Sequence, residues 1–134
     1  MQSVNLNQRL LTSAGALLAA TGMGLAAVGS HLLAARLDPA ALRSFEAAVQ
    51  FQCLNALGVL AMAWWAGRTE SGRILGLTGW GLVSGVLLFS GSIYAARAGW
   101  LESAGSLAPA GGMLVILSWL AFAVACLRVR PAGG

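Results

Sequence analysis

The residues of this chain that could do chemistry gather in one polar stretch, which runs from Gly29 to Gln52. The stretch contains the single histidine, both signs of charge and several amides, and long apolar runs lie on either side of it. The candidate residues in this stretch and just after it are His31, Arg36, Arg43, Glu46, Gln50, Gln52 and Asn55. We name this set the polar collar and expect it to contact an interaction partner or a ligand.

His31 is the candidate with the widest chemistry, because titratable side chains inside membrane proteins often relay protons or bind ligands. The structural alternative is a hydrogen bond to Glu46 or Gln52 that clamps the first helix to the second. A helix from Arg9 to His31 would rise about 33 Å, which puts His31 near a headgroup boundary rather than the membrane centre. Burial costs less at that depth, so the clamp is the preferred interpretation.

The other reactive groups predict neither an enzyme nor a metal or cofactor site. There is no acidic pair at hydrolytic spacing, no phosphate-binding glycine loop and no GxSxG motif, and one histidine cannot supply both axial ligands of haem b. Cys53 and Cys126 lie far apart with no further ligand near either. The eight basic residues are all Arg and lie at the edges of apolar runs, a pattern that sets membrane topology and argues against nucleic-acid binding.

The composition is that of a membrane protein, since 58% of the residues are hydrophobic and 9% are charged. Soluble domains carry about 25% charged residues. About 20 apolar residues span the hydrocarbon core, and four segments are long enough. We therefore expect an all-α membrane protein, a single domain over residues 1–134, with four transmembrane helices in an antiparallel bundle. The helices are predicted over 9–35, 39–67, 73–97 and 107–128.

The second helix is expected to begin with an amphipathic segment at the membrane interface. Asp38 can cap its free N–H groups, and Pro39 suits its first turn. Leu42, Phe45 and Val49 recur on one face at helical spacing, and the charged and amide side chains of the polar collar recur on the other. Gln52 and Asn55 come next, inside the spanning part, so their amides should face other helices and find hydrogen-bond partners there.

Small residues predict where the helices pack closely. In lipid, apolar contact alone gives little net attraction, so helices associate where small side chains let their backbones approach. The residues predicted to do this are Gly22, Gly24, Gly81, Gly85, Gly91 and Ser92. Ser92 lies in a segment with Ser90 and Tyr94 whose hydroxyls are expected to form interhelical hydrogen bonds.

Four spans put both ends of the chain on one side of the membrane. Five Arg residues belong to that side and three to the other. Because cytoplasmic loops carry the excess of positive charge, both termini are predicted to be cytoplasmic in a bacterial inner membrane.

Several segments resemble one family. They are Gly24 to His31, Leu37, Leu42, Phe45, Phe51-Gln52, Leu88 to Tyr94, Pro109 to Gly112 and Trp119. Together they are similar to domain of unknown function 423, a family of small membrane proteins in bacteria and eukaryotes. The resemblance implies four helices and a membrane location, and it implies no activity. The family pattern has His where this chain has Asn55, a replacement that favours a structural role over proton relay.

Three functions remain open from the sequence. The leading hypothesis is a non-catalytic accessory or assembly subunit that packs against other membrane proteins or against itself. The second is an oligomeric transporter or channel for a small solute or proton, with His31, Gln52 and Asn55 on the route. The third is binding of a lipid or quinone near Tyr94 and Trp100.

Overall fold

The computed structural model describes residues 5–130, so the terminal residues 1–4 and 131–134 of the expected domain lie outside it. The described part contains four long helices, each long and apolar enough to cross a membrane. The elements in chain order are α1 (Leu6–Val28), the π-helix η1 (Gly29–Leu33), α2 (Pro39–Ala66), α3 (Gly72–Arg97), the 3-10 helix η2 (Glu102–Leu107) and α4 (Ala108–Arg128). The predicted all-α membrane fold with four spans is confirmed.

Local sequence explains where the first two helices begin. The helix expected from residue 9 begins at Leu6, because the Asn5 side chain accepts a hydrogen bond of 2.7 Å from the Gln8 N–H. At α2, the Asp38 carboxylate accepts from the N–H groups of Ala40 and Ala41 at 2.9 and 3.0 Å, and Pro39 occupies the first turn. Asp38 is therefore the N-cap that the sequence indicates.

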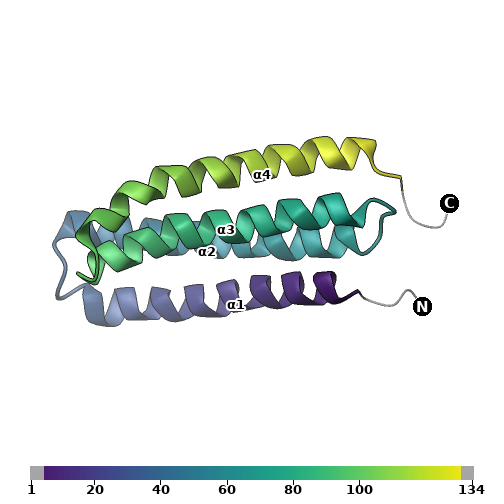
Figure 1. Ribbon diagram of the computed structural model, residues 1–134. Coiled ribbons are helices and arrows are strands. Elements are labelled where there is room, and N and C mark those ends of the chain that lie inside the picture. The colour runs from purple at the N-terminus through teal and green to yellow at the C-terminus, as the bar shows by residue number, and fades with distance from the viewer. Residues whose placement is uncertain (1–4, 131–134) are drawn as a thin grey trace.

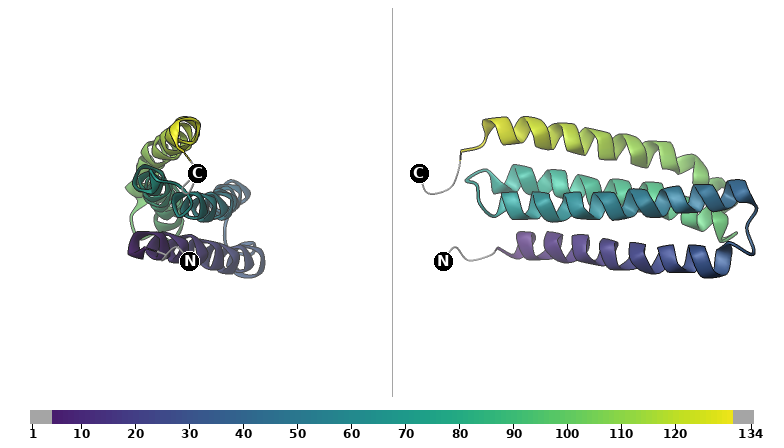
Figure 2. Two further views of the ribbon diagram at one scale, coloured as in Figure 1. Left: turned by 90° about the vertical axis from the view of Figure 1, so that its right-hand side faces the viewer. Right: turned by 180° about the vertical axis from the view of Figure 1, so that it is seen from behind.

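Consecutive helices pack side by side and run antiparallel, in the order α1, α2, α3, α4 (Figure 1). Helices α1 and α4 lie on opposite sides of the α2–α3 pair (Figure 2, left). Of the most hydrophobic stretch of each helix, 50% is buried in α2 and α3 but only 22% in α1 and α4. The bundle is thus open: a central pair carries two outer helices that do not pack along each other.

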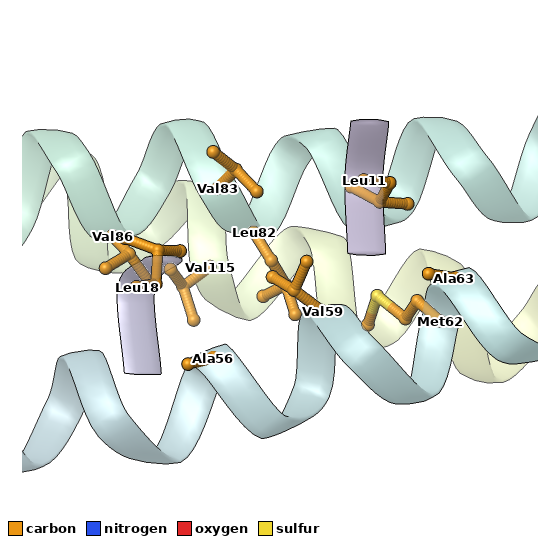
Figure 3. Packing of buried hydrophobic residues seen from close by; sticks show 10 residues of the cluster. All are labelled: Leu11, Leu18, Ala56, Val59, Met62, Ala63, Leu82, Val83, Val86 and Val115. Atoms are coloured by element: carbon orange, nitrogen blue, oxygen red, sulfur yellow. The ribbon is translucent and has the colours of Figure 1, made fainter. Parts of the chain in front are cut away.

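The main apolar core lies between the central pair and receives few residues from the outer helices (Figure 3). Its buried members are Leu11, Leu18, Ala56, Val59, Met62, Ala63, Leu82, Val83, Val86 and Val115. Leu11 and Leu18 come from α1 and Val115 comes from α4, while the others belong to α2 and α3. Each outer helix is therefore attached to the core along one narrow face.

The backbones of α4 and α3 approach each other closely at two glycines, Gly85 and Gly111. A Cβ at Gly111 would lie 2.8 Å from the Gly85 carbonyl oxygen and would also collide with the backbone nitrogen of Phe89. A Cβ at Gly85 would lie 3.0 Å from the Gly111 carbonyl oxygen. Backbone atoms cannot turn aside as a side chain can, so this crossing requires glycine on both helices.

The other small residues predicted to pack divide into two groups. Gly22 faces Cys53 of α2, with 2.6 Å between a Cβ at Gly22 and the Cys53 sulfur, and Gly81 faces Ser118 of α4. A Cβ at Gly24 or Gly91 would meet no described residue within 4 Å, so these two positions do not pack closely inside the described bundle, and close packing against another molecule there stays a prediction. Ser92 is buried, but its hydroxyl donates to the Phe89 carbonyl of its own helix at 2.9 Å. In a helix that is apolar all round, the spacing of small residues does not show which face meets a neighbour.

The glycine crossing predicts a difference between two adjacent substitutions. Gly111→Ala should lower the free energy of unfolding by about 1–3 kcal/mol, the usual cost of overpacking. Gly112→Ala is the matched control, because its Cβ would lie 3.7 Å from Phe89 Cδ2, an ordinary contact. Unfolding in detergent, followed by circular dichroism, measures both, and equal stability of the two variants would contradict the crossing.

Candidate functional site

Gln52 connects three helices through hydrogen bonds inside the bundle. Its side chain is 4% exposed, and its Nε2 donates to the Leu18 carbonyl at 2.9 Å and to the Thr21 hydroxyl at 2.8 Å, both on α1. Its Oε1 accepts from the Tyr94 hydroxyl of α3 at 2.8 Å. The Thr21 hydroxyl in turn donates to the Leu17 carbonyl at 2.7 Å. All the polar atoms of this amide therefore have protein partners.

Asn55 lies one turn further along α2 and connects that helix to α4. Its side chain is 3% exposed; its Nδ2 donates to the Phe51 carbonyl, and its Oδ1 accepts from Trp119 Nε1, each at 2.9 Å. The Trp119 ring reaches α2 because Gly58 lacks a side chain, and a Cβ there would collide with the ring. The expectation that both amides face other helices agrees with these contacts.

Ser90 adds a third polar contact between the central helices. Its hydroxyl is 1% exposed and donates to the Ala48 carbonyl of α2 at 2.8 Å. Ser90 and Tyr94 thus form the expected interhelical hydrogen bonds, whereas Ser92 does not. The buried side chains of Gln52, Asn55 and Ser90 therefore each bond to a neighbouring helix, whereas the buried Ser92 bonds within its own.

His31 does not form the expected clamp. It is exposed in η1, and its side chain has no hydrogen bond to any residue that the structure describes, while the polar atoms of Gln52 are bonded to Leu18, Thr21 and Tyr94. The residue of η1 that faces α2 is Gly29, where a Cβ would lie 2.9 Å from Phe45 Cε1. The helix widens there, with the Ala34 N–H donating to the Gly29 carbonyl at 3.0 Å. His31 follows Gly29 by two residues and so falls on another side of the helix.

The remaining members of the polar collar lie on the surface and do not converge on the two amides. Arg36, Arg43, Glu46 and Gln50 are all exposed. Near them, the hydrogen bond from the Ala41 N–H lowers the pKa of the Asp38 carboxyl below its ordinary value. Asp38 is therefore charged at neutral pH, as an N-cap facing the positive end of a helix should be. The polar collar is therefore not one site: His31, Arg36, Arg43, Glu46 and Gln50 are exposed, whereas Gln52 and Asn55 are buried.

Sequence reasoning missed the partners of the buried amides. Thr21 and Trp119 hold Gln52 and Asn55, yet neither was a candidate. The sequence feature that could have indicated Thr21 is its hydroxyl group, which lies inside an otherwise apolar run. Its pairing with Gln52 depends on how α1 is rotated against α2, which the sequence does not disclose.

A small cavity of about 190 Å³ lies where α1, α2 and α3 meet near the polar collar. Its walls are mainly apolar and include Leu25, Phe45 and Trp100, with Tyr94 and Arg97 as polar members. The Phe45 and Tyr94 rings contact each other at 5.3 Å between centroids. The described residues contain no group of three or more His, Cys, Asp and Glu side chains that could hold a metal ion.

This fold, with its buried amides between apolar helices, is that of a small integral membrane protein. Residues 25–112 match the family model described as protein of unknown function (DUF423), and the chain belongs to that family. The resemblance found in the sequence is thereby confirmed.

Several curated relatives are similar over most of their length. The UPF0382 membrane protein YwdK of Bacillus subtilis is 31% identical over 85% of this chain and 93% of its own. The UPF0382 membrane protein SERP0230 of Staphylococcus epidermidis is 32% identical over 85% and 92%, and a UPF0382 membrane protein of Haemophilus influenzae is 31% identical over 81% and 86%. No solved structure matches the chain.

The hydrogen bond between Tyr94 and Gln52 predicts a measurable coupling. Tyr94→Phe leaves Gln52 Oε1 without a donor and should cost about 1 kcal/mol of unfolding free energy. A double-mutant cycle with Gln52→Leu should give a coupling of about 0.6–1.7 kcal/mol, the range for hydrogen bonds between membrane helices. Unfolding in detergent measures each variant.

His31→Ala is the control for this cycle. Its side chain is exposed and makes no hydrogen bond with the described residues, so its stability should stay within about 0.5 kcal/mol of the parent protein. A coupling near zero, or a large loss on replacing His31, would contradict this description of the polar network.

Proposed function

We propose that this protein is a non-catalytic membrane subunit that packs against another membrane helix through the outward face of α1. The observation that carries the proposal is the row of small side chains that this face presents outside the bundle. The row consists of Ser13, Ala16, Ala20, Gly24 and Ala27, all exposed and spaced by three or four residues. A Cβ at Gly24 would have no neighbour within 4 Å among the described residues, so this face of α1 is open to a second helix.

The shape of this face supports packing against a helix. Leu17 and Met23 are 65% and 66% exposed and border the row of small residues on either side. Small residues between larger ones let the backbone of a second helix approach, which is a main source of attraction in lipid. A face that only met acyl chains would gain nothing from such small residues.

The other outer helix, α4, provides the comparison. Most of its exposed side chains are large: Met113, Ile116, Leu117, Leu120, Val124 and Leu127. Ala110, Ala121, Ala123 and Cys126 are exposed as well, but they form no row comparable to that on α1. Such residues fill the space against flexible lipid chains and keep a second backbone away. The contrast between two outer helices of equal burial supports α1 as the partner-binding helix and α4 as a lipid-facing one.

The partner can be a second copy or another membrane protein, and both belong to the proposal. The location that we propose is the inner membrane, with both ends of the chain in the cytoplasm, because five of the eight Arg residues belong to that side.

The two alternative functions have less support. For transport, Gln52 and Asn55 would have to line a route with His31, yet their polar atoms are bonded to protein and His31 is exposed elsewhere.

For lipid or quinone binding near Tyr94 and Trp100, the cavity of about 190 Å³ is favourable. However, the Tyr94 hydroxyl already donates its proton to Gln52, which leaves the Arg97 guanidinium and the Trp100 indole as the side-chain donors for a quinone carbonyl. No catalytic role is proposed, because His31 has no hydrogen-bonded acid or base among the described residues.

The outward face of α1 predicts the effect of enlarging one small residue. Ala20→Leu should weaken association about tenfold or more, or about 1.4 kcal/mol, because the added side chain separates the two backbones. The mass of the gently solubilised protein and the membrane proteins that co-purify with it measure association.

Ala123→Leu is the matched control, since it makes the same change at an exposed position of α4. It should leave association unchanged. A parent protein that is a lone monomer with no co-purifying membrane protein would sink the proposed function, and so would equal effects of the two variants.

A further inference from the structure

An apolar groove runs between the start of α3 and the second half of α4, on the side away from the core. Its volume is about 520 Å³. Its walls are formed mainly by apolar side chains, among them Ile74, Leu117, Leu120 and Val124, and its polar members are Ser71 and Arg128. Three of the large exposed residues of α4 described above, Leu117, Leu120 and Val124, thus belong to one wall of a groove.

The groove has a polar end and an apolar body. Ser71 is the N-cap of α3, and Arg128 lies in the last turn of α4, so both lie at the end of the bundle where α1 begins and α4 ends (Figure 1). From Leu117 to Arg128 α4 rises about 16 Å, roughly one leaflet of a hydrocarbon core about 30 Å thick. The groove therefore matches one leaflet in depth, with its polar end at the level of the headgroups.

Aromatic residues mark the same level. Trp64 and Trp65 lie near the end of α2 and are about half exposed, and the Arg68 guanidinium lies 4.0 Å from the centre of the Trp64 ring. Tryptophan collects at the boundary between hydrocarbon and water. The end of α2, the start of α3 and the end of α4 meet at this boundary.

Charge indicates which lipid suits the groove. This end of the bundle carries Arg9, Arg68, Arg73, Arg128 and Arg130 against Glu70 alone. The opposite end carries Arg36, Arg43 and Arg97 against Asp38, Glu46 and Glu102. The whole formal charge of +4 therefore lies at the end where the groove opens to the headgroups.

The start of α3 adds to this positive field. The Ser71 side chain makes no capping hydrogen bond, so it leaves N–H groups of the first turn of α3 without a side-chain partner. A phosphate is the group that these N–H groups and the Arg128 guanidinium can both bind.

We infer that the groove binds an anionic phospholipid, with one acyl chain along the apolar wall of α4 and the phosphate between Arg128 and the start of α3. The large side chains of Ile74, Leu117 and Leu120 keep a second helix backbone out of the groove but leave room for an acyl chain, whereas a helix would need a row of small residues such as that on α1. The positive end suits an anionic headgroup, because basic residues at the cytoplasmic surface attract anionic lipids. This inference does not depend on the association proposed for α1.

Native mass spectrometry of the full chain in detergent tests the inference with phosphatidylglycerol and phosphatidylcholine as probes. The first should form the more abundant one-to-one complex. Arg128→Gln should weaken phosphatidylglycerol binding about fivefold, which corresponds to about 1 kcal/mol for one Arg at the surface. Arg9→Gln removes the same charge from the same end outside the groove and should have a smaller effect.

A second pair of variants tests the apolar wall. Ala121 lines the groove, so Ala121→Phe should fill it and reduce binding of the lipid. Ala123→Phe makes the same change at an exposed position that does not line the groove and should bind as the parent protein does. Circular dichroism establishes that the variants are folded.

Four results would overturn the inference. Equal binding of the two lipids would contradict selection by charge. Equal effects of the Arg128 and Arg9 variants, or of the two Phe variants, would show that the lipid does not bind in the groove. Dissociation of an oligomer by Ala121→Phe would mean that protein, not lipid, occupies the groove. The association test on Ala20 reports separately on α1, so failure of one proposal leaves the other standing.

Discussion

The arrangement of the helices depends on two amides that must be hydrogen-bonded in a medium without water. In lipid, apolar side chains gain little by leaving acyl chains for each other, whereas an unbonded amide there is costly. Gln52 satisfies this requirement with α1 and α3, and Asn55 satisfies it with α4. Because both amides belong to α2, that helix fixes the rotation of the other three.

Backbone contacts complement the amides by setting distances between helices. Gly85 and Gly111 bring α3 and α4 into contact, and Gly58 admits the Trp119 ring to α2. The outward faces of α1 and α4 have no such contacts within the described bundle, and these two faces differ in the size of their exposed side chains. One presents small residues between larger ones, and the other presents large residues along a groove. The open bundle therefore offers two chemically distinct surfaces to its surroundings.

Much of the architecture could be predicted from the sequence because charges are scarce and lie at helix ends. The four charge-poor runs gave the spans, and Asp38-Pro39 gave the start of α2. The inward orientation of Gln52 and Asn55 followed from the cost of an unbonded amide. These predictions depend on local sequence or on solvation, and neither requires knowledge of which helices are neighbours.

The rest of the candidate site could not be predicted because it depends on helix rotation. Gly24 and Gly22 look alike in the sequence, yet one faces outward and the other faces Cys53. His31, the single histidine, was predicted to clamp the first helix to the second, but the π-helix puts Gly29 against Phe45 and leaves His31 exposed. In a soluble protein the alternation of polar and apolar faces would have resolved such cases, and in an all-apolar helix it does not.

Gln52 bonds to α1 and α3 whereas Asn55 bonds to α4, and this difference bears on the order in which the bundle can assemble. The chain emerges from the ribosome with α1 first, so Gln52 finds Thr21 already made and acquires Tyr94 as soon as α3 enters the membrane. Asn55 Oδ1 stays without its indole donor until α4 follows. If the helices insert in chain order, the hydrogen bonds of Gln52 are complete at a three-helix stage, and those of Asn55 are completed when α4 brings Trp119 to α2.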